Sequence, residues 1–195
     1  MFSILPRLAR FMALIAGAAL IGTAMIVSLE VILRKVFMIS LNTGVELSSY
    51  VLAIVASWGF AFALFERVHV RIDALIRLLP KHVSAYADIL AMLGILLFSL
   101  VLAWFAYGTL AETWRMQSRS MTPLAIPMWI PQVIWVLGLI VFALCCIAQL
   151  VRGSYLVVKK RYDESNDLIG NPSVMSEALA EVEQAETLST KETQP

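Results

Sequence analysis

Four long stretches of the sequence contain no charged residue, and they constrain the fold more than any other feature. They cover residues 11–29, 47–65, 89–111 and 120–151. A helix needs about 20 apolar residues to cross the hydrocarbon core of a bilayer, so each stretch is long enough to span a membrane. Backbone polar groups in lipid must be satisfied within the chain, which makes each span a helix. The fold class is therefore predicted to be all-α, an integral membrane protein with four transmembrane helices.

The spans divide the chain into a membrane part and a polar tail. They are predicted at about residues 10–33, 47–65, 84–111 and 131–151, within a four-helix transmembrane domain of residues 1–162. The first span continues past the roughly 7–15 residues of a signal-peptide core, so we expect it to be retained. Residues 163–195 hold eight of the fourteen acidic residues and a single base. Such a segment cannot bury enough apolar surface to fold alone, and we predict a disordered acidic tail.

Lysine and arginine residues are distributed unequally between the two ends of the predicted helices. The side that holds the N-terminus carries ten of them, and the opposite side carries four. The ten are Arg7, Arg10, Arg67, Arg71, Arg77, Lys81, Arg152, Lys159, Lys160 and Arg161. Because short cytoplasmic segments of membrane proteins are enriched in these residues, both termini are predicted to be cytoplasmic.

The stretch FERVHVRIDAL ends the second uncharged run and admits three interpretations. On a helix, Glu66, His69 and Asp73 share one face, which would suit a metal site or, through His69, a proton relay. Two arginines lie among them, however, and their charge opposes a bound cation. The favoured interpretation is a cytoplasmic border, where the helix leaves lipid. The residues that follow, ALIRLLPKHVS, mix apolar and basic side chains and predict a short amphipathic segment in the membrane interface.

Two carboxylates near the opposite membrane surface are predicted to have structural roles. Glu30 lies one turn before Arg34, in the order that favours an ion pair along a helix, although a charge at this depth can also mark an ion pathway. Thr43 and Glu46 have the spacing of a capping box. In that motif each side chain bonds to the backbone N–H of the other residue at the start of the helix. Neither carboxylate then needs a ligand.

The sequence contains few residues that could perform chemistry inside the membrane. Both histidines, His69 and His82, lie between the second and third spans, which argues against a haem held between helices. Cys145 and Cys146 are adjacent in the fourth span and lack the spacing of a redox pair or metal site. We predict no catalytic residues, cofactor, metal or nucleic-acid partner. A small four-helix oxidoreductase or quinone-reactive protein is kept as the alternative, on the helix count and the two cysteines.

Residues 34–80 carry a series of features that resembles the small permease subunit of tripartite ATP-independent periplasmic (TRAP) transporters. In order, these are an Arg with a Phe three residues later, a Glu opening the second span, a Trp-Gly pair, a His-Val-x-Ile-Asp run and a closing Pro. In this sequence they are Arg34, Phe37, Glu46, Trp58, Gly59, His69, Asp73 and Pro80. The four spans and the sequence Ile-Pro-Met-Trp at the entry to the fourth also agree.

The resemblance implies a supporting membrane subunit rather than an enzyme. In this family a large multi-span permease subunit carries the substrate with sodium, and a periplasmic substrate-binding protein delivers it. The resemblance thus implies a small subunit in the lipid bilayer of the bacterial cytoplasmic (inner) membrane, packed beside the large subunit. The substrate would be an organic acid such as a C4-dicarboxylate or a sialic acid. The eight matched residues are implied to have structural or partner-packing roles.

Overall fold

Four long helices make up most of the structure, a computed structural model that describes residues 4–38, 43–66, 81–122, 125–159 and 161. They are α1 (Ile4–Phe37), α2 (Gly44–Phe65), α4 (Lys81–Met116) and α5 (Trp129–Val158). All four are long and apolar enough to cross a membrane. The predicted all-α fold with four transmembrane helices is confirmed. The predicted interfacial segment, most of which falls within residues 67–80, and the acidic tail lie outside the described residues.

Each helix extends beyond the apolar stretch from which its span was predicted. Helix α1 begins at Ile4 rather than near residue 10, and α4 ends at Met116 rather than near residue 111. The added turns contain exposed charged residues such as Arg7 and Arg115. Hydropathy marks only the part of a helix inside the hydrocarbon core, whereas the hydrogen-bonded helix can continue into the polar interface.

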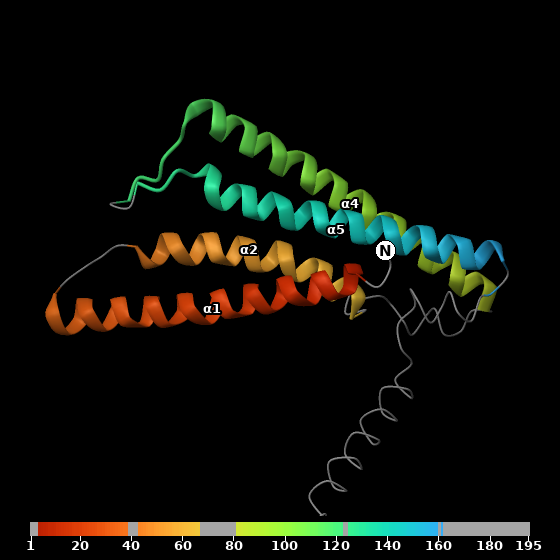
Figure 1. Ribbon diagram of the computed structural model, residues 1–195, viewed down its shortest axis with the longest axis horizontal. Helices are drawn as coiled ribbons and strands as arrows, with labels where there is room; N and C mark the ends of the chain where they lie inside the picture. Colours follow the sequence, from red (N-terminus) through yellow and green to blue (C-terminus); the bar gives the residue numbers. More distant parts are fainter. Residues whose placement is uncertain (1–3, 39–42, 67–80, 123–124, 160, 162–195) are drawn as a thin grey trace, which may run out of the picture.

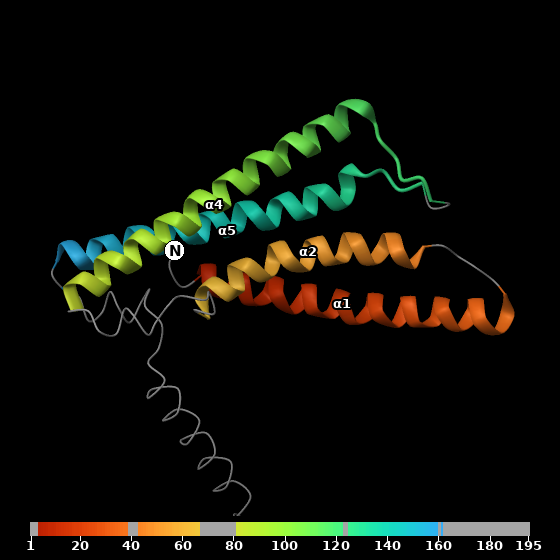
Figure 2. The ribbon, with the colours of Figure 1, turned by 180° about the vertical axis from the view of Figure 1, so that it is seen from behind.

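The helices lie in a row in the order α1, α2, α5, α4 (Figure 1). Helices that follow each other in the sequence run in opposite directions, so α1 and α2 form one hairpin and α4 and α5 form another. The contact of α2 with α5 joins the two hairpins. The end of the row that holds the end of α1 and the start of α2 is called the hairpin end. The opposite end, which we call the terminal end, holds the start of α1 and the end of α5. Figure 2 shows the same arrangement from behind.

The main apolar cluster draws residues from all four helices. It contains Ala9, Ala61, Leu64, Met92, Phe142, Cys145 and Cys146. Phe60 of α2 packs on Phe142 of α5 with ring centroids 5.4 Å apart. Both cysteines are fully buried here, where they act as small apolar side chains.

The close approach of α2 to α5 depends on Gly138. A Cβ atom at this position would meet Cδ1 of Trp58 and would lie 2.6 Å from Oγ of Ser57. The missing side chain leaves room for the Trp58 indole N–H, which donates a hydrogen bond of 3.1 Å to the Ile134 carbonyl, one turn earlier on α5. Small residues allow this kind of close contact between transmembrane helices.

We expect Gly138→Ala to lower the free energy of unfolding by about 1–3 kcal/mol, because the added methyl group overlaps Trp58 and Ser57. Denaturant unfolding of the purified full chain in detergent would measure this change. Gly94→Ala is the matched control, since Gly94 is exposed on α4 and an added Cβ there has no neighbour within 4 Å. Alanine favours the helix, so the control should be as stable as the wild type or more stable. Equal stability of the two variants would contradict this account of the α2–α5 contact.

Candidate functional site at the hairpin end

Between α4 and α5, the described residues 117–122 and 125–128 pair with each other and bring polar side chains close to α2. Arg119 and Pro127 form an isolated antiparallel bridge. Beside it, the Ser120 N–H donates to the Ile126 carbonyl at 3.0 Å, and the Met128 N–H donates to the Ser118 carbonyl at 3.1 Å. These backbone hydrogen bonds fix the path of the turn.

Glu46, in the first turn of α2, connects the two hairpins. Its side chain is buried, and one carboxylate oxygen accepts a hydrogen bond of 2.7 Å from the Tyr50 hydroxyl. The other oxygen accepts a hydrogen bond from the Thr122 hydroxyl. Ser120 supports Thr122, because its Oγ lies 3.0 Å from Thr122 Oγ1 and accepts from the Thr122 N–H at 3.2 Å. A buried carboxylate is costly unless it is hydrogen-bonded, and these hydroxyl groups supply the donors.

The predicted capping box between Thr43 and Glu46 was wrong. Thr43 makes no side-chain capping bond, and its backbone is helical (φ −102°, ψ −25°) rather than in the β region usual for a capping residue. Instead, Oε2 of Glu30 on α1 accepts a hydrogen bond of 2.7 Å from the Gly44 N–H, with a longer contact of 3.5 Å to the Thr43 hydroxyl. The carboxylate thus lies at the positive N-terminal end of α2. The predicted partner of Glu30, Arg34, is exposed.

We expect Glu30→Ala to increase amide exchange at the first turn of α2 by about five- to tenfold, equivalent to roughly 1–1.4 kcal/mol, because the Gly44 N–H loses its acceptor. Hydrogen–deuterium exchange of the full chain would report this change. Glu112→Ala, at an exposed carboxylate on α4, is the control and should leave exchange at α2 unchanged. A capping box would instead make Thr43→Ala the damaging substitution, and that result would refute the assignment.

We expect Thr122→Val to destabilise the chain by about 1–3 kcal/mol in the wild-type background, because it removes a hydrogen bond to a buried carboxylate. In a Glu46→Ala background the same substitution should cost much less. Chemical unfolding of the four proteins of this double-mutant cycle gives the coupling energy directly. Thr109→Val, which removes an exposed hydroxyl bonded to its own helix, is the control and should change stability by no more than about 0.5 kcal/mol. Independent effects of the two substitutions would argue against the Glu46–Thr122 link.

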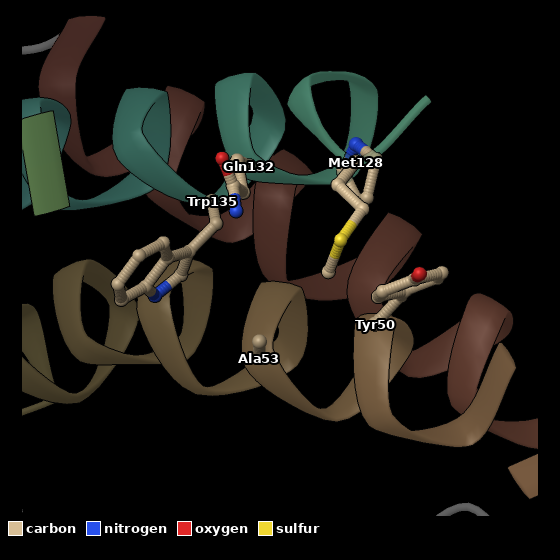
Figure 3. Close-up of a pocket in the computed structure, with 6 residues that line it drawn as sticks. Tyr50, Ala53, Met128, Gln132 and Trp135 are labelled. Atoms are coloured by element: carbon tan, nitrogen blue, oxygen red, sulfur yellow. The ribbon is translucent and has the colours of Figure 1, made fainter. Parts of the chain in front are cut away.

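A small cavity lies between α2 and α5 near Glu46 (Figure 3). Its volume is about 60 Å³, and its lining residues are Tyr50, Ala53, Met128, Pro131, Gln132 and Trp135. Pockets that enclose small-molecule ligands usually have about 300–1,000 Å³. This cavity is therefore too small to enclose an organic-acid substrate.

Five of the eight sequence-predicted positions lie within the described residues. Glu46 and Trp58 face other parts of the chain, at the two contacts that join the hairpins. Arg34 and Phe37 are exposed near the end of α1. Gly59 has no neighbour within 4 Å of an added Cβ, so packing within the described chain does not require a glycine there. The structure thus brings only part of the set into contact with other elements.

The remaining three positions, His69, Asp73 and Pro80, lie outside the described residues. The metal site considered for FERVHVRIDAL depends on two of them, so this interpretation stays a prediction. Among the residues that the structure describes, no group of three or more His, Cys, Asp or Glu could hold a metal ion. Glu66 forms an ion pair of 3.5 Å with Arg10 of α1, and the exposure of both side chains makes the pair a weak link.

Sequence reasoning missed Thr122 and Gly138. Thr122 lies in a Pro-rich loop, and no local pattern connects a hydroxyl there with a glutamate 76 residues earlier. Gly138 had a usable signal, because a glycine within an apolar span often marks a close helix contact. The identity of its partner, Trp58, depends on which helices are neighbours.

Comparison with known proteins adds one finding to this geometry. The family model described as "Tripartite ATP-independent periplasmic transporters, DctQ component" matches residues 23–154. The matched range is more than half of the chain, and it contains all of α2 and α4, most of α5 and the C-terminal part of α1 from residue 23 on. None of the curated proteins and none of the solved structures matches the chain.

Proposed function

The chain belongs to the DctQ component family of tripartite ATP-independent periplasmic transporters, and from this membership we propose that it is the non-catalytic small membrane subunit of a sodium-coupled organic-acid importer. Its partners would be a large multi-span permease subunit and a periplasmic substrate-binding protein. The chain would lie in the bacterial inner membrane with both termini cytoplasmic. The family match is the observation that carries this proposal.

The buried hydroxyl groups of the spans support a role outside the transport path. Thr23 donates to the Ala19 carbonyl at 2.8 Å, Ser57 to Ile54 at 3.0 Å, and Ser99 to Leu96 at 2.8 Å. Each hydroxyl is therefore bonded to the backbone of its own helix. Transport sites in membranes direct polar groups or broken helix ends into a cavity, whereas none of these three residues lines the cavity between α2 and α5.

The exposed surface of the row supports a packing role. Helices α1 and α4, at its two edges, expose large apolar side chains such as Phe11, Leu14, Trp104 and Phe105. Apolar surface of this kind suits lipid or another transmembrane helix. We include Arg34, Phe37 and Gly59 among the positions that would contact the large subunit, and His69, Asp73 and Pro80 among the structural or partner-packing positions.

The proposed orientation gives the two ends of the row different surroundings. The start of α1 and the end of α5 lie at the same end of the row (Figure 1), as a common cytoplasmic side for both termini requires. The hairpin end, with Glu30 and Glu46, would then face the periplasm.

The oxidoreductase alternative is not favoured. It depended on the helix count and on Cys145 and Cys146, and the family match is to a transporter component. Both cysteines are fully buried in the apolar cluster shared by the four helices. A Cys145→Ser/Cys146→Ser variant that remains folded should therefore support uptake at close to the wild-type rate.

Uptake into proteoliposomes tests the proposed function. The chain would be reconstituted with its large permease subunit and its binding protein, and sodium-driven uptake of labelled C4-dicarboxylates and sialic acid would be measured. We expect uptake of one of these acids only when all components are present. Omission of this chain should reduce the rate by at least about tenfold, the size of effect that a barrier change of 1.4 kcal/mol produces. Uptake by this chain alone, or full uptake in its absence, would overturn the proposal.

A further inference from the structure

Helix α5 is longer than the hydrocarbon core of a bilayer, so one of its ends must project. Its thirty residues span about 45 Å at a rise of 1.5 Å per residue, compared with about 30 Å for the core. At its start, Trp129 packs edge-to-face on Trp114 with centroids 5.1 Å apart, and tryptophan is typical of the membrane interface. Counted from Trp129, about 20 residues cross the core, which places the last two turns of α5 in the headgroup layer.

One side of these two turns is open and combines apolar surface with positive charge. Val151, Tyr155 and Val158 are 59%, 55% and 82% exposed, and their spacing of four and three residues puts them on one side of the helix. Arg152 and Lys159 are exposed beside them. Nζ of Lys159 lies over the Tyr155 ring, 4.6 Å from its centroid. We call these five residues the α5 basic face.

We propose that the α5 basic face binds the headgroup of an anionic phospholipid. The Lys159 ammonium and the Tyr155 hydroxyl are donors for phosphate oxygens, and charge-assisted bonds of this kind are the stronger class. Val151 lies nearest the core, where the acyl chains begin. A base near an anionic membrane surface contributes attraction that a zwitterionic surface does not supply. In the proposed orientation the lipid belongs to the inner leaflet.

The cation–π contact gives Lys159 a defined position before any lipid binds. A lysine side chain normally loses conformational entropy at several rotatable bonds when its ammonium is fixed. Here the Tyr155 ring already restricts the ammonium to the open side of the helix. Binding then costs less ordering than it would at an unrestrained surface lysine.

The other anionic candidate for this face is the chain itself. Residues 163–167, DESND, follow the end of α5 closely and contain three carboxylates. These five residues contain no apolar side chain, but Leu168 and Ile169 follow them directly, so the lipid titration below separates the two occupants. A phospholipid matches both the charge and the apolar surface.

Native mass spectrometry of the full chain, released from detergent after titration with lipid, tests the proposal. The probes are phosphatidylglycerol and phosphatidylcholine with identical acyl chains. We expect the wild type to retain several-fold more phosphatidylglycerol than phosphatidylcholine. Lys159→Gln and Tyr155→Leu should each reduce the retained phosphatidylglycerol at least threefold. Lys35→Gln removes an exposed base from the opposite end of the molecule and should leave retention unchanged.

Three results would overturn the proposal. The first is equal retention of the two lipids by the wild type, as expected if acidic residues of the chain already neutralise the face. The second is unchanged phosphatidylglycerol retention in the Lys159→Gln variant. The third is an equal loss in the Lys35→Gln variant, which would show attraction by net charge alone. Circular dichroism and size-exclusion chromatography would establish that each surface variant remains folded.

Discussion

The contact between α2 and α5 holds the two hairpins of this chain together. Within a hairpin, the two helices are joined by a short connection, but α2 and α5 belong to different hairpins. In lipid the hydrophobic effect does little to bring helices together, so association depends on close packing and hydrogen bonds. Trp58 supplies both, because it packs closely against Gly138 and its indole N–H donates a hydrogen bond to the Ile134 carbonyl. The Glu46–Thr122 link adds a second point of attachment at the hairpin end.

The fold class follows from the sequence because the membrane imposes a simple constraint on it. Stretches without charge must be helices if they lie in lipid, and their length decides that they span. The helix ends were not predictable in the same way. Helix α1 starts before Arg7, and α4 continues past Glu112 and Arg115, because charged side chains are acceptable once the helix has left the core. A hydropathy scale detects the part of a helix inside the hydrocarbon core of the bilayer and does not detect these outer turns.

Sequence patterns can predict only those contacts of the candidate site that a residue makes with near neighbours in the sequence. Thr43 and Glu46 fit a capping box locally, yet α2 is capped by Glu30, from the helix that runs beside it. Because Glu46 does not cap α2, its carboxylate can accept hydrogen bonds from the hydroxyls of Tyr50 and Thr122. No local pattern predicts these contacts, because they depend on how closely the end of α1 approaches the start of α2. Sequence reasoning predicted structural roles for both carboxylates, but it predicted neither the hydrogen bond of Glu30 to the Gly44 N–H nor that of Glu46 to Thr122.

The placement of polar groups gives the two ends of the chain different tasks. At the hairpin end, Glu30 and Glu46 are bonded to the backbone and hydroxyl groups of neighbouring elements, so their charge is used within the fold. At the terminal end, Lys159 of the α5 basic face is exposed, and its ammonium lies over the Tyr155 ring. Between the ends, the buried serine and threonine hydroxyls are bonded to their own helices. A chain built in this way has fixed internal contacts and an apolar exterior, and both agree with the supporting role proposed for it.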